Sequence, residues 1–247
     1  MDTSGSAPSR WRGRYSSSIA NFHEKLDKRL KLNRKFSLFA PTIFIGMYHW
    51  VDYIRFIFHL GEKKIFWCGS DILALEKTWV KKLILGQNKQ NFVENWVEFK
   101  KLDSFGSKHV NTIPMIFDDP DKYPICYKPS PTPRVFATYH KGREKEYGYF
   151  EHPQVDWFCD LSEDEFNEKI KEYQGCIRLN RFDGFAESLA KSVLMGQYQY
   201  SAYIGYPGME SRILFDQWLE KLANQPVNPL AIYWRRTLEE SKQILLS

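Results

Sequence analysis

The sequence of 247 residues lacks the features that mark several specialised classes of protein. It has no run of the roughly 18–20 consecutive apolar residues that a membrane-spanning helix needs. Its basic first residues are followed by no apolar stretch of the kind found in secretory signals. Its four cysteines stand apart, without a Cys-x-x-Cys pair or a Cys/His spacing typical of zinc. We therefore expect buried, reduced thiols in a cytoplasmic protein, and no structural metal.

Short catalytic motifs are also missing. The sequence contains no Walker loop, no His-Glu-x-x-His, no Ser-His-Asp order, no paired hydrolase carboxylates and no Asp-x-Asp metal motif. Its charge is nearly balanced, since 35 Lys and Arg stand against 30 Asp and Glu and leave a net charge of +5. Such a mild excess is compatible with a nucleotide diphosphate, a nucleic acid or an anionic membrane surface as partner.

The chain is rich in apolar residues, with 43% hydrophobic and 16% aromatic residues. This content is enough to form the core of one large domain or of two compact ones. Residues 1–18 are rich in Ser, Gly and Arg and predict a disordered tail. Ile19, Phe22, Leu26 and Leu30 then recur at helical spacing opposite a basic face. We favour a helix packed on the domain, with a peripheral position on the inner face of a membrane as the alternative.

From there the chain alternates between strand-like and helical segments. Its first half, residues 19–130, predicts strands at 42–46, 64–68 and 111–117 and helices at 51–60, 72–85 and 91–102. Five prolines between 118 and 133 predict a linker. Its second half, 134–225, predicts strands at 134–139, 155–159, 176–179 and 198–204, with helices between them and then at 209–223, and a last helix lies in 229–247. This order predicts α/β lobes with parallel sheets covered on both faces.

Ligands of open parallel sheets bind at the carboxyl ends of the strands, so residues at those ends are candidates for a site. Lys141, Arg143 and Lys145 follow one strand and are suited to neutralising a pyrophosphate. Asp183 and Gly184 follow another, where the carboxylate could accept hydrogen bonds from sugar hydroxyls and the glycine allows close approach. A charged surface turn and an ordinary Asp-Gly turn are the alternative interpretations.

Two residues of the first half occupy comparable positions. His49 and Asp71 lie just past predicted strand ends. Asp71 could orient an acceptor hydroxyl or act as a base, and His49 could contact the sugar. Helix capping for Asp71 and a plain helix start for His49 are the alternatives.

Residues 174–203 resemble the donor-binding signature of retaining GT-B glycosyltransferases, the group of sucrose-synthase-like and mannosyltransferase enzymes. The shared features are a strand, an acidic residue followed by glycine, a helix, and a glycine before the next strand. By this resemblance Asp183 faces the donor sugar, residues 140–147 form the diphosphate loop, and Gly46 lies in the glycine loop that faces the diphosphate. The resemblance implies two Rossmann-like lobes, with the N-terminal one reduced. The residues it places near the donor are Gly46, Lys141, Arg143, Lys145, Arg178, Asn180, Gly184, Phe185, Glu187 and Lys191.

One position departs from that pattern. The family's second acidic residue binds the ribose five positions before the helix-ending glycine, and this chain has Lys191 there. Because lysine accepts no hydrogen bond, ribose recognition is altered, absent, or shifted to a neighbour such as Glu187.

The resulting expectation is a metal-independent hexosyltransferase that uses a nucleotide sugar as substrate and no cofactor. Its acceptor would be a hydroxyl of a glycan, a lipid-linked sugar or a protein, and a homodimer could complete the small first lobe. One alternative is a non-catalytic relative that binds a nucleotide or glycan or serves as a scaffold. Another is a basic nucleic-acid-binding protein, although no RRM, KH or helix-turn-helix signature is present.

Overall fold

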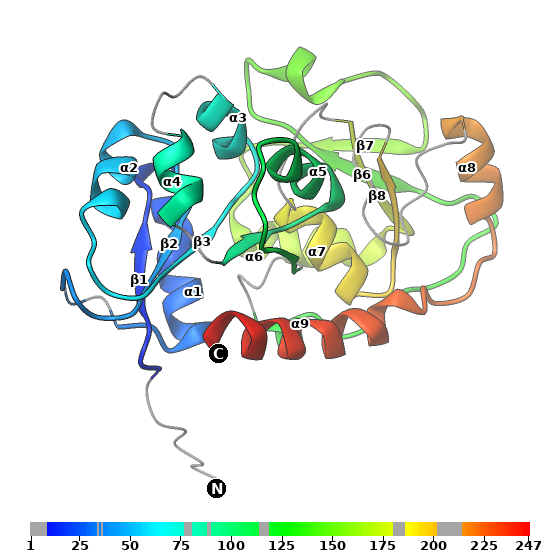
Figure 1. Ribbon diagram of the computed structural model, residues 1–247. Coiled ribbons are helices and arrows are strands. Elements are labelled where there is room, and N and C mark those ends of the chain that lie inside the picture. The colour runs from blue at the N-terminus through cyan, green and yellow to red at the C-terminus, as the bar shows by residue number, and fades with distance from the viewer. Residues whose placement is uncertain are drawn as a thin grey trace, which may run out of the picture. The chain divides into compact units, whose positions relative to one another are not determined.

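The computed structural model divides the chain into two compact units. Unit 1 comprises Met1–Asp118 and Glu239–Ser247, and unit 2 comprises Asp119–Leu238. Each contains one parallel β-sheet, of five and four strands respectively (Figure 1). This confirms the predicted α/β class with two Rossmann-like lobes. The structure describes residues 9–33, 35, 37–76, 81–87, 90–113, 119–179, 186–201 and 214–247, without the side chains of 20–23.

The sheet of unit 1 has its five strands in sequential order. They are β1 (Arg12–Tyr15), β2 (Thr42–Ile45), β3 (Lys63–Phe66), β4 (Asn91–Val93) and β5 (Val110–Thr112). All neighbours are parallel, with Arg14 beside Phe44 and Phe44 beside Ile65. On its outer side, Arg12 forms an isolated parallel bridge with Asn33. After β1, the chain therefore bridges to one edge of that strand through Asn33 and then crosses to its other edge to form β2.

Helices cover both faces of this sheet. They are η1 (Ser17–Phe22), α1 (His23–Leu30), α2 (Trp50–Ile57), α3 (Asp71–Glu76), α4 (Lys81–Gln87) and α5 (Trp96–Ser104). Phe44 and Ile65 face the α2 side, where Phe44 meets Phe56 with ring centroids 5.2 Å apart. Tyr15, one position along β1, faces the opposite side, where its hydroxyl donates to Asp27 of α1 at 2.5 Å. Alternation along the strands thus divides the apolar side chains between two layers.

The apolar face of α1 packs within unit 1, because Leu26 and Leu30 are fully buried. The packed interpretation of this basic helix therefore holds. No helix in the described ranges is long and apolar enough to cross a membrane.

The predicted disordered tail is wrong for its last residues. Trp11 is fully buried and its indole Nε1 donates to Leu246 O at 2.6 Å, while Arg12 N donates to Pro41 O at 2.9 Å as β1 begins. Composition indicated disorder, but a buried tryptophan and pairing with β2 supply the interactions that order this segment. A second correction concerns residues 91–102, predicted as one helix, which form strand β4 followed by α5.

In unit 2 the strands do not follow chain order. They are β6 (Val135–Thr138), β7 (Val155–Phe158), β8 (Gly175–Arg178) and β9 (Tyr198–Ser201), arranged β7-β6-β8-β9 and all parallel. Val135, Ile177 and Tyr200 pack against α8 on one face, and Phe136 meets Phe166 of α6 on the other. The remaining elements are η2 (Pro120–Lys122), η3 (Glu144–Tyr147), α6 (Glu163–Lys169), η4 (Ile170–Glu172), α7 (Glu187–Leu194), α8 (Phe215–Leu222) and α9 (Leu230–Leu246).

The proline-rich segment is packed on unit 2. Tyr123 and Tyr127 are buried, and the Arg235 guanidinium donates to Pro120 O at 2.6 Å and to Tyr123 O. These contacts hold the segment against α9, so the described part of the expected linker belongs to unit 2. Helix α9 covers the predicted range and passes from unit 2 to unit 1 after Leu238.

The four cysteines are free. Only Cys176 is buried, while Cys68, Cys126 and Cys159 are partly exposed, so the expectation of buried thiols holds for Cys176 alone.

Candidate functional site

Unit 2 has a topological switch point between β6 and β8. The chain leaves β6 to form β7 on one side and then crosses back to form β8 on the other side. At such a point the two connecting segments diverge, which leaves space at the carboxyl ends of the two central strands. The residues there are Thr138, the last of β6, and Arg178, the last of β8.

Arg178 joins the two strand ends. Its guanidinium NH1 donates to Thr138 Oγ1 at 3.3 Å, and its Cζ lies 5.1 Å from the centre of the Tyr147 ring. Tyr147 is buried and also meets the His140 ring at 5.4 Å. A planar cation stacked on an aromatic ring is restricted in orientation and well suited to holding a phosphate group. The structure therefore brings Arg178 together with the predicted diphosphate loop.

The loop itself differs from the expected form. Residues 144–147 form a short 3-10 helix at its end. Lys141 and Lys145 are exposed, and Arg143 pairs with Glu146, its Nε donating to Glu146 Oε2 at 2.8 Å. Part of the loop's positive charge is thus balanced within the loop.

Helix α7 begins at the same edge of the sheet, after β8. Its N-cap is Ala186, which has no side chain that could accept a hydrogen bond from the first turn. The first-turn N–H groups lack a side-chain cap, and the helix dipole favours an anion there. The predicted residues Asn180, Asp183, Gly184 and Phe185 lie outside the described residues.

Lys191 and Glu187 face each other on α7. Lys191 Nζ lies 3.0 Å from Glu187 Oε1 and 3.1 Å from Glu163 Oε1 of α6, and only 4% of the lysine side chain is exposed. Its ammonium also lies 5.5 Å from the centres of the Tyr123 and Phe166 rings. The described contacts make Lys191 an internal cation that ties α7 to α6.

In unit 1 the equivalent switch point lies between β1 and β2, because Asn33 bridges to the outer side of β1. Gly46 and His49 follow β2 there. Gly46 has φ +69°, and an added Cβ would lie 2.9 Å from Ile19 Cδ1. His49 is the exposed N-cap of α2, and its Nε2 lies 2.9 Å from Ser18 Oγ.

Asp71 is close to Gly46 and His49 in the fold but is fully buried. Its carboxyl accepts hydrogen bonds from Met47 N at 2.9 Å, Cys68 N at 3.1 Å and Ile72 N at 3.0 Å. Burial outweighs these donors and raises the pKa of Asp71 to about 7. The carboxyl therefore links the loops after β2 and β3, and it has no exposed surface to offer an acceptor.

Two further buried carboxyls lie near Asp71, and sequence reasoning missed them. Glu98 is fully buried, its Oε2 accepts from Glu94 N at 2.7 Å, and its own N–H donates to Asn95 Oδ1 at 2.9 Å. Burial, followed by the charge of Glu94, raises the pKa of Glu98 well above its usual range. The Asn95-x-x-Glu98 capping pattern could have marked this helix start. Within the described ranges no three His, Cys, Asp or Glu side chains are arranged to hold a metal ion.

Comparison with protein-family models and with curated proteins finds no match. Among solved structures, a complex of the pneumococcal O-GlcNAc transferase GtfA with UDP and GlcNAc matches 83% of this chain and 55% of its own, at 9% identity and TM-score 0.46. A sucrose-phosphate synthase from Thermosynechococcus elongatus matches over 83% and 68%, at 11% identity and TM-score 0.48. The lipopolysaccharide galactosyltransferase WaaB matches over 92% and 72%, at 13% identity and TM-score 0.44. These are retaining GT-B glycosyltransferases. The likeness concerns the fold alone, and this chain spans about half the length of GtfA.

Proposed function

We propose that this protein is a glycosyltransferase that transfers a sugar from a nucleotide-sugar donor to an acceptor hydroxyl. The observation that carries the proposal is the position of Arg178, at the switch point of the unit 2 sheet, stacked on Tyr147 of the basic loop. The start of α7, which has no side-chain cap, lies at the same edge. An arginine stacked on an aromatic ring, two exposed lysines and a helix N-terminus together suit a diphosphate.

In this reaction the protein acts mainly by binding the substrates and stabilising charge. The bond between the sugar C1 and the diphosphate oxygen breaks, and the electron pair leaves with the nucleoside diphosphate. A bond forms from C1 to the acceptor oxygen, whose proton passes to a base or to the departing phosphate. Arg178 and the lysines Lys141 and Lys145 would stabilise the charge that develops on the leaving group. Asp183 would contact the donor sugar, as the sequence resemblance implies.

Donor binding and turnover are tested together on the whole chain. The protein is melted with a panel of nucleotides and nucleotide sugars, and release of nucleoside diphosphate is measured with those that raise the melting temperature. We expect one nucleotide sugar to stabilise the wild type and Arg178→Gln to lose most of that shift. Arg134→Gln serves as the control, since Arg134 precedes β6 at the amino end of the strands, pairs with Asp156 and carries the same charge.

The results separate the enzyme from its main rival. A ligand that stabilises the protein without any release of diphosphate would favour the non-catalytic binding protein, for which the altered Lys191 position is the specific observation. No shift with any nucleotide, or equal shifts in Arg178→Gln and Arg134→Gln, would contradict the donor site proposed here.

A further inference from the structure

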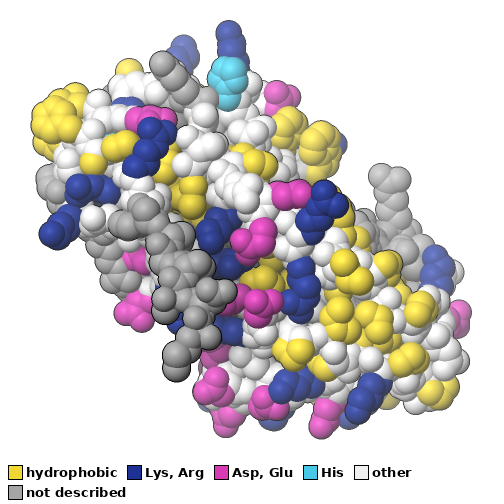
Figure 2. All heavy atoms as spheres, turned by 90° about the horizontal axis from the view of Figure 1, so that it is seen from below, with side chains coloured by type: hydrophobic (Ala, Val, Ile, Leu, Met, Phe, Trp, Pro, Cys, Tyr) yellow, Lys and Arg dark blue, Asp and Glu magenta, His cyan; other side chains and the backbone are white. Residues whose placement is uncertain are grey.

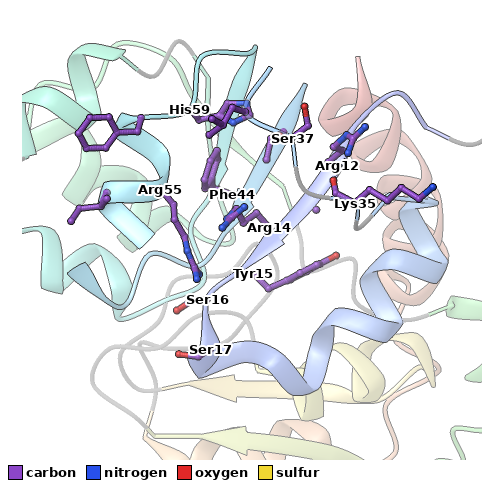
Figure 3. Close-up of a pocket in the computed structure, with 15 residues that line it drawn as sticks. Arg12, Arg14, Tyr15, Ser16, Ser17, Lys35, Ser37, Phe44, Arg55 and His59 are labelled. Carbon is purple, nitrogen blue, oxygen red and sulfur yellow. Dashed lines mark hydrogen bonds between the residues drawn. The ribbon is translucent and has the colours of Figure 1, made fainter. Parts of the chain in front are cut away.

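A cavity of about 590 Å³ lies over strand β1 in unit 1 (Figure 3). Strand alternation places Arg12 and Arg14 on the side of the sheet that carries α2, next to Thr42 and Phe44 of β2. Helix α1 lies on the other side, where it meets Tyr15. The α2 side of β1 is therefore left as a hollow between the sheet, helix α2 and the segment that contains Lys35 and Leu38.

The charged side chains of this hollow all have one sign. The fifteen described residues that line it include Arg12, Arg14, Lys35 and Arg55 but no Asp or Glu. In Figure 3, Arg12 and Lys35 lie together at one end, while Arg14 and Arg55 approach each other from β1 and α2 near Ser16. Burial and the charge of Arg55 lower the pKa of Arg14.

The Asp52 carboxylate, which lies beside Arg55, is already engaged. Asp52 Oδ1 lies 4.0 Å from Arg55 NH1, and Oδ2 of the same group accepts from Ser16 Oγ at 2.7 Å and from His49 N at 3.0 Å. An anion that entered the cavity would reduce the repulsion among its lining cations.

The rim of the cavity is apolar and exposed. Leu38, Ile54 and Phe58 line it with 39%, 42% and 68% of their surface exposed, and their neighbours Phe39 and Leu60 are exposed to 71% and 69%. The rim is a fixed part of the fold, because Leu60 N and Gly61 N both donate to Leu38 O, at 2.9 and 3.0 Å. Single exposed apolar residues are common, but a group of five beside one cavity marks an interaction surface.

This combination differs from the charged surface on the face drawn in Figure 2. On the face drawn in Figure 2, Lys and Arg side chains alternate with Asp and Glu. At the β1 cavity, by contrast, cations without lining carboxylates are surrounded by large exposed apolar side chains. A free polyanion would gain nothing from such a rim, whereas the headgroup and adjoining chains of an anionic lipid match both parts.

We propose that the β1 cavity binds the phosphate headgroup of an anionic phospholipid, with Phe58 and its apolar neighbours entering the membrane interface. The cationic residues of the cavity bind the phosphate, and the rim contributes apolar contact. The surface is separate from the apolar face of α1, which is buried. The lipid-binding proposal does not depend on whether the protein transfers sugars.

The proposal is tested by cosedimentation of the full chain with vesicles of phosphatidylcholine alone and of phosphatidylcholine mixed with phosphatidic acid. We expect binding only to the mixed vesicles, and loss of it at high salt. The double variant Arg12→Gln/Arg55→Gln should bind about 30-fold more weakly, since each arginine near the surface contributes roughly a fivefold effect. Phe58→Ser should weaken binding about tenfold through lost apolar contact.

Matched controls keep the test specific. Lys100→Gln/Lys108→Gln removes the same charge from exposed positions of unit 1, and Leu83→Ser removes an exposed apolar side chain from α4. Both should bind like the wild type, and the melting curves of all variants report whether they fold. A third arm titrates inorganic pyrophosphate in the absence of vesicles.

Three results would overturn the proposal. Failure of the wild type to bind phosphatidic acid vesicles removes it directly. Equal binding by the cavity variants and their controls shows that general charge or another surface is responsible. Saturable pyrophosphate binding that depends on Arg12 and Arg55, without vesicle binding, identifies a soluble phosphate ligand instead of a lipid.

Discussion

Lys191 Nζ lies 3.0 Å from Glu187 Oε1, one helical turn away on α7, and the lysine side chain is almost completely buried. Glu187 is thus engaged with the residue that replaces the acid of the related signature. A ligand that used Glu187 for ribose would compete with this ion pair. The lysine at position 191 therefore affects two positions of the signature. It stands in place of one carboxylate and pairs with another, that of Glu187.

We expect very different effects on stability from two substitutions at Lys191. Lys191→Met keeps an apolar stem of similar length against Tyr123 and Phe166 and leaves Glu163 and Glu187 partly hydrated, so the free energy of unfolding should stay within about 1 kcal/mol of wild type. Lys191→Glu places a third carboxylate at this buried position and should cost about 3–5 kcal/mol. Urea unfolding measures both.

The double variant Lys191→Glu/Glu187→Lys tests the pairing itself. It restores opposite charges one turn apart and should recover about half of the loss caused by Lys191→Glu alone. Additive behaviour of the two substitutions would show that the pair contributes nothing beyond its separate residues.

Glu98 should make unit 1 less stable as the pH rises. Its pKa in the folded protein is raised above that of the unfolded chain, so the folded protein binds the proton more tightly and stability falls as the pH rises from the unfolded pKa through the folded one. Asp71, whose pKa is raised to about 7, acts in the same direction between about pH 4 and pH 7.

Glu98→Gln should therefore raise the melting temperature at pH 8 and have little effect at pH 5. A glutamine oxygen can still accept the hydrogen bond from Glu94 N. Glu165→Gln is the control, because the hydrogen bond from Ser162 lowers the pKa of this exposed carboxyl and keeps it ionised at both pH values. Equal pH dependence in wild type and Glu98→Gln would contradict the burial of a titrating group here.

Alanine substitutions at Gly46 and Gly142 distinguish the stability cost of backbone strain from the cost of close packing. Both have positive φ, at +69° and +80°, but an added Cβ at Gly46 would lie 2.9 Å from Ile19 Cδ1, whereas nothing lies within 4 Å at Gly142. We expect Gly142→Ala to cost about 1 kcal/mol and Gly46→Ala about 2–4 kcal/mol. In the Gly46→Ala background, Ile19→Val removes the clashing methyl and should recover part of the difference. The measurement is the free energy of unfolding. If Ile19→Val has no effect in that background, the whole cost of Gly46→Ala comes from backbone strain.

Local patterns predicted much of the second unit. Ser162 and Glu165 form the expected capping box at the start of α6, with Glu165 N donating to Ser162 Oγ at 3.3 Å. Helix α9 covers the range that the break after Pro229 indicated. These features depend on residues a few positions apart, so a sequence carries them directly.

Residues whose partners are distant in the chain were misjudged. Trp11 was placed in a disordered tail, yet its partner Leu246 is at the other end of the sequence. Asp71 was a candidate base, but its burial and its contact with Met47 depend on how β2 and β3 pair. The basic cavity escaped notice for the same reason, because Arg14 and Arg55 meet only once α2 lies beside β1.

The sequence by itself determined most of the alternation of strands and helices, apart from β1 and β4, because hydrophobic periodicity, glycine, proline and capping residues act over one or two turns. The order of the strands, and with it the switch points at Thr138 and Arg178 and at Ser16 and Gly46, was decided by tertiary structure. Strand order follows from which apolar faces bury one another most completely, a property of the whole chain that no local pattern contains.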